Sequence, residues 1–301
     1  MDIVEKIQAL KEEKNAIVLA HYYVPNEVQE IADYIGDSFA LAKIAKKTDA
    51  DIIVFAGVKF MGESAKILNP EKKVLAPDAC ADCAMAHMAS IEKVKVMREK
   101  YDDLAVVCYI NSTAELKTVS DVCVTSSNAV KIVENLPQQN IYFIPDQNLG
   151  SYVKSVVKNK NIILNDGYCP VHHQMLKDNV LEAKKEHPEA LVLVHPECKK
   201  EVLELADYVG STSGIIDFAT KSEKDSFIIG TELGVFYELQ KQNPNKHFYP
   251  LLKSMICEDM KMITLEKIYT CLKNETNEVF VEEETKQKAL NALNQMLEMA
   301  K

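Results

Sequence analysis

Three cysteines stand alone at nearly equal intervals along this chain of 301 residues. Cys83 and Cys169 are 86 residues apart, and Cys257 follows 88 residues later. Thiolates bind both zinc and iron–sulfur clusters, but structural zinc sites are usually built from closely spaced pairs of cysteines. A [4Fe–4S] cluster normally takes four thiolates, so three would leave one iron open to act as a Lewis acid. The spacing leaves a cluster, a zinc site and unligated thiols as alternatives.

The remaining cysteines do not share this interval. Cys80 forms a C-x2-C motif with Cys83, but the chain has no second such pair, so Cys80 is interpreted as incidental. Reduced cysteines outside such motifs usually behave as small core hydrophobes. The cysteines expected to be structural for this reason are Cys108, Cys123, Cys198 and Cys271.

Two histidines occupy the same position in two related segments. AIVLAHYYVPNEVQEIADYIGDS, at residues 16–38, aligns without a gap with ALVLVHPECKKEVLELADYVGST, at residues 190–212. The alignment has 11 identities in 23 positions and places His21 opposite His195. Matched histidines that follow apolar strands favour contact with a ligand. Glu197 is a candidate general acid or base, because a partly desolvated carboxyl group can have a raised pKa.

The histidines next to Cys169 lack such a match. His172 and His173 have no counterparts near the other two cysteines, so they are interpreted as structural.

Three polar pairs recur in the same register and point to anion binding. These pairs are Asp37-Ser38, Thr125-Ser126 and Ser211-Thr212. Each follows a short strand-like stretch and could begin a helix, where hydroxyl groups and free backbone N–H groups bind carboxylate or phosphate. The alternative is that they are three ordinary helix caps.

The elements that must position these residues form an internal triplication with a period of about 87 residues. Each copy contains three apolar strands separated by helical stretches, and its single cysteine follows the third strand. Strands that are apolar throughout, such as AIVLA and IIVFA, are typical of parallel sheets covered on both faces. The pattern predicts three α/β domains of αβα type, related by pseudo-threefold symmetry and built on short parallel sheets.

We expect the domain boundaries at 1–86, 87–173 and 174–301, with an amphipathic C-terminal helix packed on the third domain. In open parallel sheets, ligands bind beyond the carboxyl ends of the strands. The histidines, the polar pairs and the cysteines all follow strands, so the active site is expected in a central cavity between the domains.

Composition excludes several other classes of protein. The formal net charge of −10 argues against binding to a nucleic-acid backbone. No run of apolar residues approaches the length that spans a bilayer, and no signal peptide is recognisable, which predicts a cytoplasmic protein. Phosphate-binding glycine motifs are also missing from the sequence.

Several ordered motifs together resemble the quinolinate synthase family over nearly the whole chain. They are AHYY at 20–23, YINSTAELK at 109–117, VTSSNA at 124–129, PDQNLG at 145–150, GYCPVH at 167–172, HPEC at 195–198, DYVGST at 207–212, GTELG at 230–234 and CEDMKMITLE at 257–266.

The resemblance implies a transferase that condenses iminoaspartate with dihydroxyacetone phosphate, giving quinolinate, phosphate and water in the de novo biosynthesis of NAD. It implies a [4Fe–4S] cluster bound by Cys83, Cys169 and Cys257, with the open iron assisting dehydration. It further implies small-molecule substrates, a possible transient contact with the enzyme that supplies iminoaspartate, and no nucleic acid or membrane as partner.

The same resemblance, together with the polar pairs, assigns the site residues. The expected catalytic residues are Glu197, Tyr23 and Tyr109. The expected substrate-binding residues are His21, Ser38, Tyr109, Ile110, Asn111, Ser126, His195, Pro196, Glu197, Ser211 and Thr212. Two rival functions stay open, a hydro-lyase acting on a hydroxy acid and a non-catalytic iron–sulfur sensor.

Overall fold

The computed structural model describes residues 2–301 and contains three parallel sheets of four strands each. The first sheet, in the order β2-β1-β3-β4, consists of β1 (Ala16–His21), β2 (Tyr34–Gly36), β3 (Ile52–Ala56) and β4 (Lys73–Leu75). The second, in the order β6-β5-β7-β8, consists of β5 (Leu104–Tyr109), β6 (Val122–Val124), β7 (Asn140–Ile144) and β8 (Asn161–Leu164). The third, in the order β10-β9-β11-β12, consists of β9 (Leu191–Val194), β10 (Tyr208–Val209), β11 (Ser226–Gly230) and β12 (His247–Pro250).

The three sheets carry the same succession of helices, so we refer to them as the first, second and third units. The helices of the first unit are α1 (Ile3–Glu13), α2 (Asn26–Ile31), α3 (Ser38–Lys47) and α4 (Lys59–Leu68). Those of the second are α5 (Ile91–Lys100), α6 (Ala114–Thr118), α7 (Ala129–Asn135) and α8 (Gln147–Val156). Those of the third are α10 (Lys177–Glu186), α11 (Lys200–Leu203), α12 (Thr212–Lys221) and α13 (Val235–Gln242).

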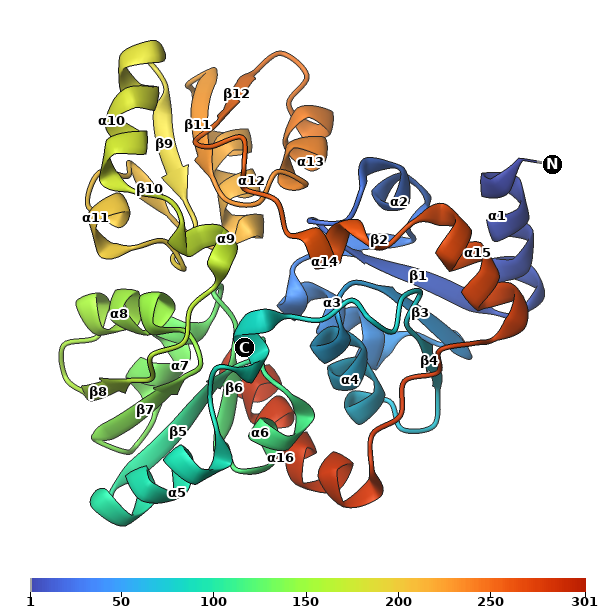
Figure 1. The fold of residues 1–301 in the computed structure, drawn as a ribbon, viewed down its shortest axis with the longest axis horizontal. Coiled ribbons are helices and arrows are strands. Elements are labelled where there is room, and N and C mark those ends of the chain that lie inside the picture. The colour runs from blue at the N-terminus through green and yellow to red at the C-terminus, as the bar shows by residue number, and fades with distance from the viewer. Residues whose placement is uncertain (1) are drawn as a thin grey trace.

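A short helical turn follows the last strand of each unit. These turns are η1 (Ala84–His87), α9 (Pro170–His173) and α14 (Glu258–Lys261). Figure 1 shows the three units as separate lobes around a centre near which α9 and α14 lie. The prediction of three αβα units with short parallel sheets is therefore confirmed. The exact domain boundaries remain a prediction.

The central strands are buried because helices cover both faces of each sheet. Every residue of β3 and of β5 is buried, as their continuous apolar sequences predict. Candidate site residues lie at or just beyond the carboxyl ends of central strands, such as His21 at the end of β1 and Asn111 after β5. The sheets thus act as rigid supports that hold polar side chains at one edge.

The C-terminal segment joins the first two units, and its predicted packing on the third unit is wrong. Helix α15 (Leu265–Asn274) packs beside α1, and residues 277–279 bond to the backbone along β4. Helix α16 (Glu283–Met299) then packs against α6, β6 and α4, as Figure 1 shows. An amphipathic pattern identifies an apolar face of a helix, but it does not specify which apolar surface that face will cover.

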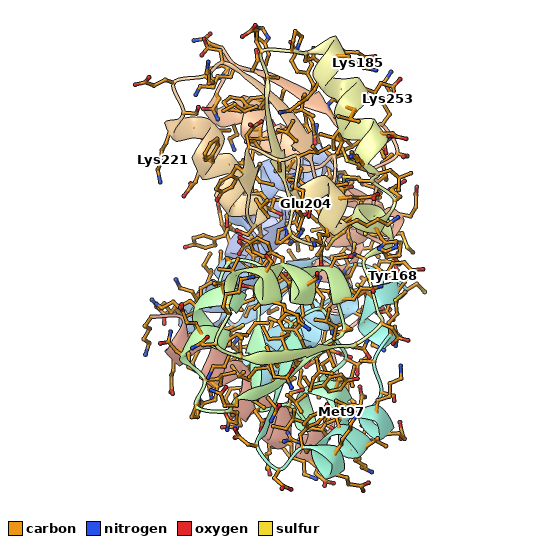
Figure 2. All side chains as sticks on the ribbon, turned by 90° about the vertical axis from the view of Figure 1, so that its left-hand side faces the viewer. Met97, Tyr168, Lys185, Glu204, Lys221 and Lys253 are labelled. Carbon is orange, nitrogen blue, oxygen red and sulfur yellow. The ribbon has the colours of Figure 1, made fainter. Side chains whose placement is uncertain are left out.

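This arrangement gives the first two units one continuous hydrophobic core, which includes Leu293 and Met296 of α16. The third unit has its own core clusters, around Val192 on one face of its sheet and Leu193 on the other. In the side view of Figure 2, the third unit with Lys185 and Lys221 lies at one end, and Met97 of the second unit lies at the other. The third unit therefore has hydrophobic clusters of its own, distinct from the core that the first two units share.

Candidate active site

The carboxyl ends of the strands of all three units meet around one central cavity of about 80 Å³. Most of the predicted site residues line it. They are Cys83, Cys169 and Cys257, together with His21, Tyr23, Ser38, Tyr109, Asn111, Ser126, His195, Glu197 and Thr212. The repeat therefore brings together residues that are up to 236 positions apart in the sequence, since both His21 and Cys257 line the cavity.

Three predicted substrate-binding residues are near the cavity without lining it. Ile110 is 1% exposed, and its backbone N–H donates to the carbonyl of Val124. Ser211 caps helix α12 by accepting a hydrogen bond from the backbone N–H of Gly214. Pro196 is buried between His195 and Glu197. These residues shape the backbone behind the site, and their predicted contact with substrate remains a prediction.

Each of the three predicted metal ligands directly precedes a helical turn. Cys83, Cys169 and Cys257 are the N-cap residues of η1, α9 and α14. In each case the backbone N–H of the residue three positions later donates a hydrogen bond to the cysteine sulfur, and this bond favours the thiolate. The donors are Ala86, His172 and Met260. Hydrogen bonds to sulfur of this kind tune iron–sulfur sites.

Burial opposes ionisation of the same thiols in the absence of a cation. It raises the pKa of Cys83 to about 12 and that of Cys257 to about 11, and it raises the pKa of Cys169 further above its ordinary value. A metal ligand must be deprotonated, so binding would release protons from these thiols. Three converging thiols that are costly to ionise alone fit a site that a cation completes.

The distances between the ligand atoms distinguish a single zinc ion from an iron–sulfur cluster at this site. Four ligands of one zinc ion, with sulfur at about 2.3 Å from the metal, lie about 3.8 Å apart. Among residues 2–301, the group whose ligand atoms all lie within 4.8 Å of one another is Cys169, His172 and Glu197, not the three cysteines. A cluster binds each thiolate to a different iron and so accepts wider spacing. The spacing favours a cluster over one zinc ion held by the three thiols.

The group of Cys169, His172 and Glu197 is better described as a hydrogen-bonded pair beside a thiol. His172 Nδ1 lies 2.8 Å from Glu197 Oε2 and 3.2 Å from Cys169 Sγ. Nitrogen and oxygen ligands of one zinc ion at about 2.0–2.1 Å would lie about 3.3 Å apart, which is wider than this contact.

Two buried carboxylates hold the backbone of two cysteines. Asp146 accepts a hydrogen bond from the backbone N–H of Cys169, and Glu232 accepts one from that of Cys257, each at 3.1 Å. Asp146 and Glu232 both lie two residues beyond the third strand of their unit, and both are fully buried. The first unit differs, because the side chain of Asp82 accepts the backbone N–H of Cys83.

Glu197 lies between two histidines at the heart of the cavity. Its Oε2 is 2.8 Å from His172 Nδ1 and 3.2 Å from His195 Nδ1, and the two imidazole rings stack with centroids 4.6 Å apart. Burial would raise the pKa of Glu197, but the charges and hydrogen bonds of His172 and His195 outweigh burial and lower it. The expected upward shift is therefore wrong, since the pairing with histidine was not visible in the sequence. His172, interpreted as structural, is part of this site.

Tyr23 and His21 also line this cavity. The Tyr23 hydroxyl group lies 2.7 Å from Thr212 Oγ1 and 2.8 Å from Thr231 Oγ1. The backbone N–H of Tyr23 donates to His21 Nδ1, so the neutral His21 ring carries its proton on Nε2. Burial lowers the pKa of His21 to about 3 and raises that of Tyr23 well above its ordinary value.

Two polar side-chain atoms of residues that line the cavity are buried and have no hydrogen-bond partner. They are Asn111 Oδ1 and Glu197 Oε1. Buried polar atoms in native proteins are normally paired with protein, water or ligand. Both atoms are acceptors, so the bound molecule should present N–H or O–H donors to them.

The three polar pairs are divided between capping and lining. Asp37 caps α3 and Ser211 caps α12, and every member of the three pairs except Ser211 lines the cavity. In the second unit the expected helix start is wrong by three residues, because α7 begins after Asn128. There the Asn128 side chain accepts the backbone N–H of Thr125 and shapes a turn instead. Hydroxyl groups from all three units nevertheless face one space.

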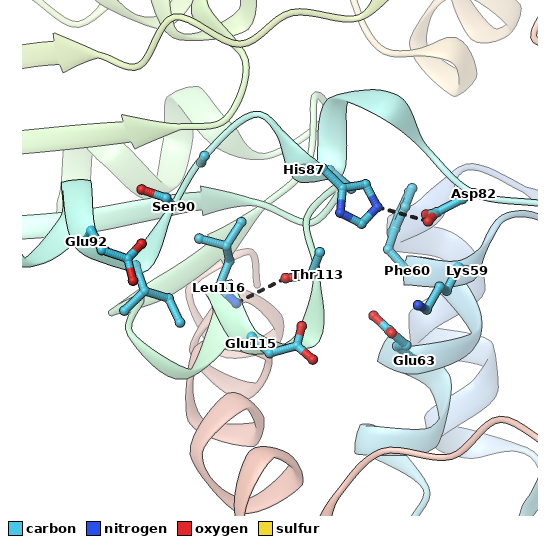
Figure 3. A pocket seen from close by; sticks show the side chains of 13 residues that line it. Lys59, Phe60, Glu63, Asp82, His87, Ser90, Glu92, Thr113, Glu115 and Leu116 are labelled. Atoms are coloured by element: carbon cyan, nitrogen blue, oxygen red, sulfur yellow. Dashed lines mark hydrogen bonds and ion pairs between the residues drawn. The ribbon is translucent and has the colours of Figure 1, made fainter.

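A second pocket, open to solvent, lies between the first and second units. Figure 3 shows Lys59 and Glu63 of α4 facing Thr113 and Glu115, with His87 bonded to Asp82 at 2.9 Å. Phe60 and Asp82 line both pockets and so form the wall between them. Four carboxylates against one lysine and one histidine make this pocket unfavourable for anions.

Comparison with known proteins agrees with the site. The family model described as "Quinolinate synthetase A protein" matches residues 5–298. The chain is 57% identical to a quinolinate synthase of Fusobacterium nucleatum over 296 residues, covering 98% of this chain and 99% of that protein. It is 54% identical over 298 residues to one of Caldicellulosiruptor saccharolyticus and 52% identical over 299 residues to one of Clostridioides difficile, covering 99% of this chain and 98% of each relative.

Within residues 2–301, no helix is both long enough and apolar enough to cross a bilayer. The repeated units, the shared cavity and the match over nearly the whole chain lead to one assignment: this chain belongs to the quinolinate synthetase A protein family.

Proposed function

We propose that the chain is a quinolinate synthase that condenses iminoaspartate with dihydroxyacetone phosphate, releasing phosphate and water, in the de novo biosynthesis of NAD. The observation that carries this proposal is a single cavity with three thiols from three units beside hydroxyl and imidazole groups suited to anions. Membership of the family supports it. As a transferase of small molecules, the protein would work in the cytoplasm and could contact the enzyme that supplies iminoaspartate.

The fit of the residues supports a [4Fe–4S] cluster on Cys83, Cys169 and Cys257. Each thiol receives a backbone N–H, and the thiols are spaced too widely for one shared ion. When bound, the cluster would supply an open iron as a Lewis acid for a substrate hydroxyl group.

Other side chains that line the cavity would bind the substrate anions. Iminoaspartate carries two carboxylates and the triose carries a phosphate, and both need hydrogen-bond donors. Ser38, Ser126 and Thr212 supply hydroxyl groups from the three units. His21 can donate from Nε2, because its Nδ1 already accepts the backbone N–H of Tyr23. Donors fixed by the scaffold orient the two substrates for reaction.

Proton transfer would be divided between Glu197 and the tyrosines. The lowered pKa of Glu197 keeps it ionised near neutral pH, so it can accept protons during enolisation and ring closure. Burial raises the pKa values of Tyr23 and Tyr109 well above the ordinary range, so both hydroxyl groups stay protonated and can donate. Glu197 is thus assigned as a base, and the two tyrosines as hydrogen-bond or proton donors.

Product analysis tests this proposal. Anaerobically purified protein, supplied with dihydroxyacetone phosphate and freshly generated iminoaspartate, should form quinolinate and phosphate in equal amounts. Glu197→Gln should keep the iron but lose most turnover, because the amide cannot accept the proton. Unchanged turnover in that variant would remove Glu197 as the base. Dehydration of a hydroxy acid without formation of a pyridine would instead support the rival hydro-lyase.

A further inference from the structure

Lys117 is a lysine whose side chain is completely buried, although it is not among the residues that line the cavity. It belongs to α6 of the second unit. Its Nζ donates a hydrogen bond to the backbone carbonyl of Ser112 and lies 5.8 Å from the centre of the Phe60 ring. Lysine is almost never fully buried unless other groups bind its charge, because removing an ammonium group from water is costly. The contacts of Lys117 should therefore show what the charge does here.

The carbonyl group that Lys117 binds belongs to a tight turn between β5 and α6. The backbone N–H of Ser112 donates to the carbonyl of Ile110 at 2.8 Å, and the Ser112 hydroxyl group lies 2.9 Å from Cys108 Sγ in β5. The residue enclosed by this turn is Asn111, whose side chain lines the cavity. Its Oδ1 is buried and has no hydrogen-bond partner within residues 2–301. Ser112 is thus held by β5 on one side and by Lys117 on the other, and its position sets the direction of Asn111.

The first unit holds the same region of the chain through α4. Glu63 Oε2 accepts the backbone N–H of Ala114 at 3.1 Å, and Phe60 of the same helix lies beside the ammonium group. Figure 3 shows Phe60 and Glu63 opposite Thr113, the residue that caps α6. Burial raises the pKa of Glu63, and the positive charge of Lys117 opposes that shift. The lysine and the glutamate therefore interact across the boundary between the first and second units.

Two acidic groups near Lys117 help to keep its charge in the interior. One is Glu63, and the other is the thiol of Cys108. Burial would raise the pKa of Cys108, but a hydrogen bond with Cys123, the charge of Lys117 and a hydrogen bond with Ser112 lower it to about 7. The ammonium group nevertheless donates its hydrogen bond to the turn that carries Asn111, rather than to either acidic group.

We propose that Lys117 is a positioning residue for the reaction, whose ammonium group holds the Ser112 carbonyl and so fixes the turn that presents Asn111 to the substrate. A hydrogen bond from a charged donor is about twice as strong as one between neutral groups, so it suits a turn that must not move. This inference rests on the proposed function, because it assigns Asn111 to substrate binding. Lys117 itself does not touch the substrate.

A double-mutant cycle with Asn111 tests the proposal. Lys117→Met removes the charge and keeps an unbranched side chain. It should lower kcat/KM by about 10- to 100-fold, the effect of losing a hydrogen bond to a charged group. In the background of Asn111→Ala the same substitution should cause a further loss of less than about threefold, because Lys117 then has no site residue to position.

Two other variants complete the kinetic experiment. Lys117→Gln keeps a donor without the charge, so its loss should be smaller and equally absent in the background of Asn111→Ala; it replaces Lys117→Met in the cycle if that variant does not fold. Lys154→Met is the matched control, because Lys154 of the second unit also donates to a backbone carbonyl, that of Ile162 at 2.9 Å, away from the cavity. Its kcat/KM should equal that of the wild type.

Two kinetic outcomes would overturn the proposal. One is a kcat/KM of Lys117→Met within about twofold of the wild type. The other is the same fold-loss with Asn111 present and with Asn111→Ala, which would show that Lys117 acts on the fold in general rather than through Asn111.

Hydrogen–deuterium exchange separates this inference from the proposed function, because it requires no turnover. In Lys117→Met, the backbone amides of residues 110–114 should exchange about tenfold faster than in the wild type, while those of β9 in the third unit keep their rates. If the wild type forms no quinolinate, the proposed function fails, and exchange still decides whether Lys117 holds the turn. Unchanged exchange at residues 110–114, or equally faster exchange in β9, would overturn the proposal.

Discussion

His21 should make the free energy of unfolding depend on pH in a way that its removal abolishes. Burial lowers its pKa from 6.5 to about 3, and the nearby positive charges of His195 and Lys261 contribute in the same direction. The geometry agrees, because protonation of Nδ1 would break its hydrogen bond with the backbone N–H of Tyr23. The folded state therefore resists a proton that the unfolded state accepts readily.

The sign and size follow from linkage between proton binding and folding. A group whose folded pKa is depressed stabilises the protein above its unfolded pKa, and this stability is lost as pH falls from about 6.5 toward 3. With these two pKa values, the loss attributable to His21 is about 2 kcal/mol between pH 7.5 and pH 5.0. It would approach about 5 kcal/mol only near pH 3.

Urea unfolding of the iron-free protein at several pH values would measure this effect. His21→Asn replaces the ring by an amide that does not titrate, so the wild type and variant differ in this one proton. The difference between their free energies of unfolding should fall by about 2 kcal/mol from pH 7.5 to pH 5.0. A difference that stays constant across this range would refute the account of His21 as a buried neutral donor.

Three further substitutions test the packing around the site. Glu232→Gln should lower the iron content and raise the rate of alkylation of Cys257 in the iron-free protein. The carboxylate uses Oε1 for the Cys257 backbone N–H and Lys261 and Oε2 for the Gly234 backbone N–H, whereas the amide has one acceptor oxygen and no charge for Lys261. Equal iron and equal alkylation would count against this role. Gly167→Ala should destabilise the protein by about 1–3 kcal/mol, since a Cβ in this loop before Cys169 would lie 2.6 Å from the carbonyl oxygen of Pro145. An unchanged midpoint of urea unfolding would contradict this prediction. Leu293→Ala should lower the free energy of unfolding by about 2–5 kcal/mol, because this fully buried side chain of α16 belongs to the core shared by the first two units. A decrease of less than about 1 kcal/mol would show that α16 is not part of that core.

The repeated part of the site could be predicted because the sequence repeats with the structure. His21 and His195 match in the alignment, and both strands that precede them end at the cavity. The single cysteines could be predicted for the same reason, since each follows the fourth strand of its unit and precedes a helical turn.

The part that escaped prediction has no counterpart in the other copies. His172 lies three residues after Cys169, at the position occupied by Ala86 and Met260 in the other units, so the repeat gave no reason to select it. One signal was available: a helical turn that starts at Cys169 brings the residue three positions later back beside the thiol. Thr231 could not be selected from the sequence either, because its hydrogen-bond partners, Tyr23 and His172, depend on how the units pack together.

The packing of α16 shows a similar limit. Leu290, Leu293 and Leu297 identify one apolar face, and the structure buries Leu293 against the second unit. Nothing in the helix itself distinguishes the apolar surface of the second unit from that of the third. Such a choice depends on the shape of the complementary surface, which only the assembled chain provides.

The central claim is that three cysteines, one from each unit, hold a single iron–sulfur cluster. Iron, sulfide and visible absorbance should be measured on anaerobically purified protein, with Cys83→Ala, Cys169→Ala, Cys257→Ala and the exposed control Cys80→Ala. The account predicts about four irons and four sulfides per chain in the wild type and in Cys80→Ala, and loss of the cluster in each of the other three variants. A colourless protein that contains zinc or no metal, and that tolerates all three substitutions, would contradict it.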